Sequence, residues 1–262
     1  MNKLVLIGAA DSIGVPYSKD NKNNEGFFEL IEKDLSKKYE LISVNCFHMA
    51  VNNDNDYISK LINNNYSIAD IKKSQNAMLN KCKYSGIYPY IEMPKKFLNY
   101  YKVKENDKNI FIRDIIKNND VFFIYSALIN DLLKYKKISL FKLLIPGKLK
   151  KELKNLDLSF VFEKIEKNIS DLINLNKNIK IYIIGLFIPT KLPYIRKMVA
   201  SLIIEINTKL NELSNKYDNV FIINNENLTN EDFNNIDFHP NRKGHLKIYN
   251  NFCKEYSNKI IK

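Results

Sequence analysis

The sequence has few of the residues that mark loop-rich, disulfide-bonded or metal-binding proteins. Only 7 of its 262 residues are glycine and 7 are proline, which argues against a loop-rich or fibrous protein. The 3 cysteines, Cys46, Cys82 and Cys253, lie far apart and form no CxxC pair. This spacing argues against a zinc site and a disulfide framework, and it fits a reducing compartment.

Long apolar runs are also absent. No stretch approaches the roughly 20 apolar residues that a membrane-spanning helix needs. Met1 to Lys3 are followed by only a few apolar residues before Asp11, too few for the apolar core of a signal peptide. We therefore expect a cytoplasmic protein without stable membrane insertion.

Acidic residues are outnumbered, with 29 Asp and Glu against 41 Lys and Arg and a net charge of +12. Such an excess can attract nucleic acid, anionic lipid or acidic substrates. Here nearly all the basic residues are lysines scattered among Asn and Ile, and lysine lacks the bidentate fork that suits arginine to phosphate. We expect no nucleic-acid binding, and the sequence leaves the oligomeric state open.

Apolar segments and helical segments alternate along the chain. Five continuous apolar runs are typical of strands buried on both faces of a parallel sheet; they cover residues 4–7, 39–44, 121–125, 179–185 and 220–223. Helical spacing follows in residues 27–35, 160–173, 195–217 and 245–261. This alternation predicts βαβ units, and so an α/β protein: a three-layer α/β/α sandwich around a five-stranded parallel sheet.

Two connections between the predicted strands are long. Residues 66–110 are rich in Tyr, Lys and Asn, and residues 134–156 are rich in Lys and Leu. No repeat or clear linker divides the chain, so we predict a single domain over 1–262. The two insertions form either a lid over a binding site or extra helices packed outside.

Ser12 lies in a small-residue turn, Gly8 to Gly14, that follows the first strand. Ligands of open parallel sheets bind beyond the carboxyl ends of the strands, so Ser12 is in place for a nucleophile. Its backbone N–H could help to hold an oxyanion. The alternative is a serine that caps a helix.

A serine hydroxyl needs a base to take its proton, and a base with a pKa near 7 means histidine. Of the three histidines, His239 lies on a predicted loop before the last helix. His48 is expected to be structural, and His245, on the last helix, is expected to take no part in the chemistry. In an extended segment Asp237 can reach His239 and hold its tautomer. The alternative is a turn in which Asn241 or its neighbours cap the last helix.

Asn130 follows the third strand and carries a side-chain amide that could donate to an oxyanion. Asn130 or Asp131 could equally cap the helix that begins there.

Taken in this order, these segments resemble blocks I, III and V of the SGNH (GDSL-like) hydrolase superfamily. Residues 10–13, Ala-Asp-Ser-Ile, match Gly-Asp-Ser-Leu, and residues 129–131, Ile-Asn-Asp, match the end of Gly-x-Asn-Asp. Residues 237–241, Asp-Phe-His-Pro-Asn, with Gly244, match the histidine block. Ala50 is the nearest match to the glycine of block II, and the resemblance spans nearly the whole chain.

The resemblance implies a flavodoxin-like fold and a serine esterase or acylhydrolase that forms an acyl-enzyme and uses no cofactor or metal. Ser12 would attack the carbonyl of a small or lipid-like ester, His239 would take and return the proton, and Asp237 would orient His239. The N–H groups of Ser12 and Ala50 and the Asn130 side chain would form the oxyanion hole.

The chain departs from the family pattern in two ways. The family spaces Asp-x-x-His, but residue 236 is Ile. Either Asp237 serves at the shorter spacing, which we favour, or Asp232 folds back, or the histidine works without a carboxylate. Family glycines are replaced at Ala10, Ala50 and Leu128 in the numbering of this chain, which keeps a non-catalytic binding protein as an alternative. Acyl transfer and sugar deacetylation also remain open.

Overall fold

The structure is a computed structural model, and it describes residues 2–8, 26–35, 38–45, 57–63, 67, 69–70, 110–119, 122–126, 158–187, 193–233 and 240–260. Its centre is a sheet in which every strand pair is parallel, in the order β2-β1-β3-β4-β5. The strands are β1 (Asn2–Gly8), β2 (Tyr39–Asn45), β3 (Phe122–Ser126), β4 (Lys180–Ile184) and β5 (Val220–Ile223). Each overlaps one of the apolar runs in the sequence.

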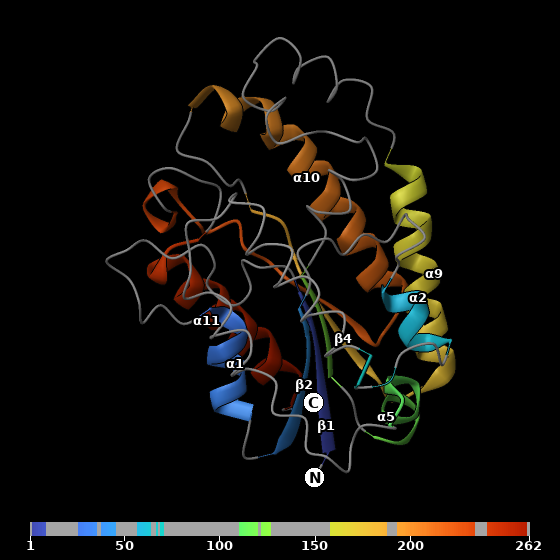
Figure 1. Ribbon diagram of the computed structural model, residues 1–262. Coiled ribbons are helices and arrows are strands. Elements are labelled where there is room, and N and C mark those ends of the chain that lie inside the picture. The colour runs from blue at the N-terminus through green and yellow to red at the C-terminus, as the bar shows by residue number, and fades with distance from the viewer. Residues whose placement is uncertain are drawn as a thin grey trace, which may run out of the picture.

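Helices flank the sheet on two sides (Figure 1). On one side lie α1 (Phe27–Leu35) and α11 (Arg242–Ile260). On the other lie α2 (Tyr57–Ile62), α5 (Ile112–Asn118), α9 (Ser159–Leu175) and α10 (Pro193–Lys216). A short 3₁₀ helix, η3 (Asn230–Asp232), lies between β5 and α11. The predicted α/β class is confirmed.

Strand β4 explains why the sequence reads as a continuous apolar run at this point. Ile181 and Ile183 are buried in the core that contains residues of α9 and α10. Tyr182 and Ile184 are buried in the core that contains residues of α1 and α11. Alternate side chains of a strand point to opposite faces, so a sheet covered on both faces needs apolar residues at every position.

The strand order has a consequence for ligand binding. The chain passes from β1 to β2 on one side, and β3, β4 and β5 follow on the other side of β1. In open sheets of this order the connections after β1 and β3 diverge to opposite faces, and ligands bind in the crevice beyond the carboxyl ends of these two strands. The region beyond Gly8 and Ser126 is therefore the first place to look for a site.

Buried amides join the carboxyl end of β4 to helix α10 and to the end of β5. The Asn207 side chain accepts from the Leu186 backbone N–H at 3.0 Å and donates to the Leu186 carbonyl at 2.9 Å. The Asn225 amide donates to the Gly185 carbonyl at 3.0 Å. A Cβ on Gly185 would lie 2.9 Å from the backbone oxygen of Ile223, so a glycine fits this close approach of the two strands.

We expect Asn207→Ala to lower the free energy of unfolding by about 2 kcal/mol, because it leaves the buried N–H and C=O of Leu186 without partners. Asn211→Ala is the matched control, one turn further along α10 with an exposed side chain. It should change the stability by less than about 0.5 kcal/mol. Urea unfolding of the two variants measures the difference, and equal midpoints would contradict the role of Asn207.

The two long insertions, 66–110 and 134–156, lie almost wholly outside the described residues. Within the part of the chain that is described, no helix has the length and apolar character needed to cross a membrane.

Candidate active site

Three of the predicted segments begin side by side at the carboxyl edge of the sheet. Gly8, the last residue of β1, pairs with Asn45 of β2 on one side and with Ser126 of β3 on the other. These three residues end the strands that lead to the segments of Ser12, Ala50 and Asn130. Ser12, Ala50 and Asn130 themselves lie outside the described residues, so their roles stay predictions.

The histidine segment ends near the same edge. Asp237 and His239 lie outside the described residues, but Pro240 pairs with Phe233 in an antiparallel bridge. The Phe233 ring centroid lies 5.4 Å from that of Phe187, which follows the carboxyl end of β4. The ends of the segment that carries Asp237 and His239 are therefore held next to the carboxyl edge.

Helices α1 and α11 meet at their first turns. The Phe27 ring lies 5.9 Å from the His245 ring, and His245 is only 1% exposed. The connection that carries Ser12 ends at α1, and the segment that carries His239 ends at α11, so this contact joins the far ends of both. His245 is therefore packed where the two helices meet, and it lies on the last helix as the sequence predicts.

Asn241 caps α11. Its Oδ1 accepts from the Gly244 backbone N–H at 3.1 Å, which is the bond expected of a helix N-cap. Its Nδ2 donates to the carbonyls of Glu231 and Phe233 at 2.7 and 3.1 Å, so the cap also joins α11 to the segment around η3. The capping role considered for Asn241 is confirmed, and it is compatible with a catalytic residue at position 239.

Gly244 allows the first turn of α11 to approach η3 closely. A Cβ at this position would lie 2.2 Å from the Asp232 backbone oxygen and 3.0 Å from Pro240 Cβ. The first of these distances is far below a van der Waals contact. Steric exclusion of any side chain therefore explains why a glycine occupies this position of the histidine block.

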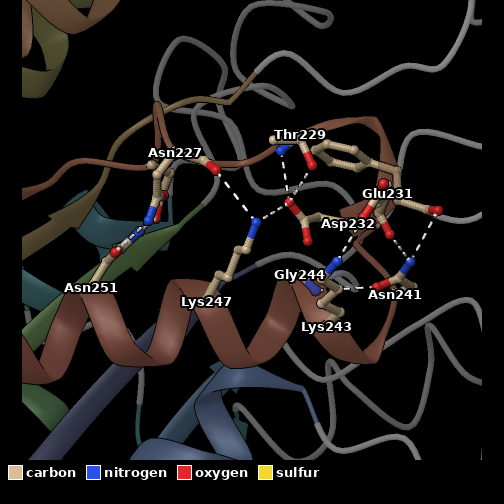
Figure 2. Close-up of polar contacts among 11 residues, drawn as sticks. Asn227, Thr229, Glu231, Asp232, Asn241, Lys243, Gly244, Lys247 and Asn251 are labelled. Atoms are coloured by element: carbon tan, nitrogen blue, oxygen red, sulfur yellow. Dashed lines mark hydrogen bonds and ion pairs between the residues drawn. The ribbon is translucent and has the colours of Figure 1, made fainter.

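Asp232, the alternative partner of His239, is fully buried and accepts three hydrogen bonds at Oδ2 (Figure 2). The donors are the Thr229 N–H at 2.7 Å, the Thr229 hydroxyl at 3.1 Å and the Lys247 ammonium at 2.6 Å. Burial by itself raises the pKa of Asp232, but these donors outweigh it and hold the pKa below the ordinary 3.8. Asp232 is therefore ionised at neutral pH.

The sequence predicts no role for Lys247, because none of the residues near it in the chain distinguishes it from the other lysines. It lies on α11, and only the fold brings its ammonium to Asp232.

Within the described residues, no group of three or more His, Cys, Asp or Glu side chains is arranged to hold a metal ion. Cys253 is partly buried, and burial is the main cause that raises the pKa of its thiol. A raised pKa is the opposite of what a nucleophilic cysteine needs.

Comparison with known proteins shows which solved structures share this fold. No protein-family model and no curated protein sequence matches the chain. A solved lipase, Lip_vut3 from a goat rumen metagenome, matches with a TM-score of 0.57 and 13% identity over 97% of both chains. Phospholipase A1 from Streptomyces albidoflavus matches with a TM-score of 0.51 and 10% identity over 97% of this chain and 99% of that chain.

A third solved structure is the acetyl xylan esterase Est2A from the rumen bacterium Butyrivibrio proteoclasticus. It matches with a TM-score of 0.50 and 14% identity over 99% of this chain and 64% of that chain. The chain thus has the fold of these lipases and esterases.

Proposed function

We propose that this protein is a serine esterase or acylhydrolase that cleaves a carboxylic ester through an acyl-enzyme. The observation that carries the proposal is the register at the carboxyl edge, where Gly8 pairs with both Asn45 and Ser126. The segments of Ser12, Ala50 and Asn130 begin at these neighbouring strand ends, where ligands of such sheets bind. The shared fold with solved lipases and esterases supports the same reaction class.

In the proposed mechanism the Ser12 hydroxyl attacks the ester carbonyl while His239 takes its proton. Asp237 orients the imidazole, and the N–H groups of Ser12 and Ala50 with the Asn130 side chain stabilise the oxyanion. His239 then gives the proton to the leaving alcohol, and water releases the acyl group by the same steps in reverse. The bridge of Phe233 with Pro240 supports this role for His239, since it holds the end of the histidine segment near the strand ends.

Labelling with an alkyl fluorophosphonate tests the nucleophile. An activated serine oxygen displaces fluoride from phosphorus and keeps the phosphonyl group, so we expect mass spectrometry to find the added mass on the peptide that contains Ser12. Ser12→Ala should stay unlabelled. Ser126→Ala is the matched control, because this serine ends the neighbouring strand β3, and it should label like the wild type.

Two results would count against the proposal. If the wild type is not labelled at all, the alternative of a non-catalytic binding protein becomes the better explanation. If Ser12→Ala labels as fast as the wild type, the nucleophile is another residue.

A further inference from the structure

The two ends of the segment that carries Asp237 and His239 are joined by backbone hydrogen bonding. Phe233 and Pro240 form an antiparallel bridge, and the Asn241 backbone N–H donates to the Asp232 carbonyl at 2.9 Å. These contacts close the segment at its base and make its entry and exit neighbours in space.

A buried ion pair joins the same two places. The Asp232 carboxylate, at the end of η3, is 0% exposed, and the Lys247 side chain, on α11, is 30% exposed. Their atoms lie 2.6 Å apart. Lys247 also lies 3.5 Å from the Asn227 carbonyl oxygen, and Figure 2 shows it reaching from α11 toward the segment that leads into η3. The pair therefore links the chain before the histidine segment to the helix after it.

Stability alone does not explain this ion pair. Taking a carboxylate out of water costs several kcal/mol, and apolar residues of similar volume are often as stabilising as a buried ion pair. Among the described residues, Asp232 Oδ1 is buried and has no hydrogen-bond partner. A buried ion pair instead fixes how two elements are placed relative to each other, because any other placement leaves a buried charge without its partner.

A second ion pair joins the same two elements and serves as an internal comparison. Lys243 of α11 and Glu231 of η3 lie 2.8 Å apart, but their side chains are 56% and 78% exposed. Exposed pairs contribute about 0–1 kcal/mol and tolerate other geometries. Only the Asp232–Lys247 pair has the burial that makes its geometry obligatory.

We propose that Asp232 and Lys247 are positioning residues of the catalytic histidine. By fixing the base of the segment between Phe233 and Pro240, the pair sets the distance from His239 to the nucleophile. Neither residue touches the reacting atoms in this assignment. The inference rests on the proposed function, since it takes His239 as the base.

The test compares Lys247→Met with Lys243→Met in hydrolysis of p-nitrophenyl acetate, at a temperature where circular dichroism finds each variant folded. A misplacement of the base by a fraction of an ångström lowers kcat but leaves substrate binding alone, so we expect Lys247→Met to lose about tenfold in kcat, with KM changed less than about twofold. Lys243→Met should match the wild type. Lys247→Arg, which keeps the positive charge, should recover most of the loss. Equal kcat in the two methionine variants would overturn the proposal.

A double variant separates positioning from folding. Asp232→Asn with Lys247→Met leaves no unpaired charge, so it should fold even if Lys247→Met alone does not, yet it lacks the constraint on geometry. We expect its kcat to stay about tenfold low. A wild-type kcat in this double variant would overturn the proposal.

A measurement that does not depend on activity tests the role of the Asp232–Lys247 pair separately from the proposed esterase function. The Asn241 amide, which donates to the Asp232 carbonyl, should exchange its hydrogen faster in Lys247→Met than in Lys243→Met. If the wild type neither hydrolyses esters nor reacts with a fluorophosphonate, the proposed function fails, and this comparison still tests the link. Equal exchange in the two variants would show that the pair does not fix the segment.

Discussion

His239→Ala is expected to lower kcat for ester hydrolysis by about 10²–10⁴-fold, the size of a lost general base. Without the imidazole, the Ser12 hydroxyl keeps its proton and remains a weak nucleophile. Steady-state rates on p-nitrophenyl esters from acetate to laurate measure the loss. The same series identifies the preferred acyl length from the wild type.

His245→Ala is the contrasting variant. His245 is buried against Phe27 where α1 and α11 meet, so its loss should lower the unfolding temperature while the folded variant keeps most of its kcat. His239→Ala should do the reverse. If His239→Ala retained the wild-type kcat, another group would have to act as base, and the proposed mechanism would be wrong.

Gly244→Ala is expected to destabilise the protein by about 3 kcal/mol, which corresponds to an unfolding temperature lower by about 6–12 °C. The new methyl group would lie 2.2 Å from the Asp232 backbone oxygen, and a backbone atom held by the Asn241 N–H cannot move aside alone. Overpacking costs about 1–3 kcal/mol or more, and this contact is severe. The higher helix propensity of alanine recovers only about 1 kcal/mol.

Lys243→Ala is the control for Gly244→Ala, because it changes the preceding residue of the same helix turn. It removes only an exposed ion pair with Glu231, so its effect should stay below about 1 kcal/mol. Thermal unfolding followed by circular dichroism compares the two. Equal unfolding temperatures would mean that α11 can shift away from η3 at little cost.

The sequence was a good guide to the secondary structure. The runs at 39–44 and 220–223 became β2 and β5, because residues buried on both faces of a sheet must be apolar at every position. The helical spacing at 195–217 became α10, since a helix that covers a sheet repeats its apolar residues every three or four positions.

The site was less accessible from the sequence. Motif and spacing picked out Ser12, Asn130 and His239, but these residues lie outside the described part of the chain and their roles remain proposals. Asn241 and Gly244 were noticed as parts of a motif. Their physical roles, a helix cap and a close approach to Asp232, required coordinates.

By itself the sequence determined that this is an α/β protein, because burial and periodicity are local properties that each segment carries. It also placed a serine after the first strand and a histidine before the last helix. Only the tertiary structure decided the strand order, which makes Gly8 the neighbour of both Asn45 and Ser126. The same holds for the pairing of Asp232 with Lys247, since an interaction between distant parts of the chain depends on how the elements pack and leaves no periodic signal in either segment.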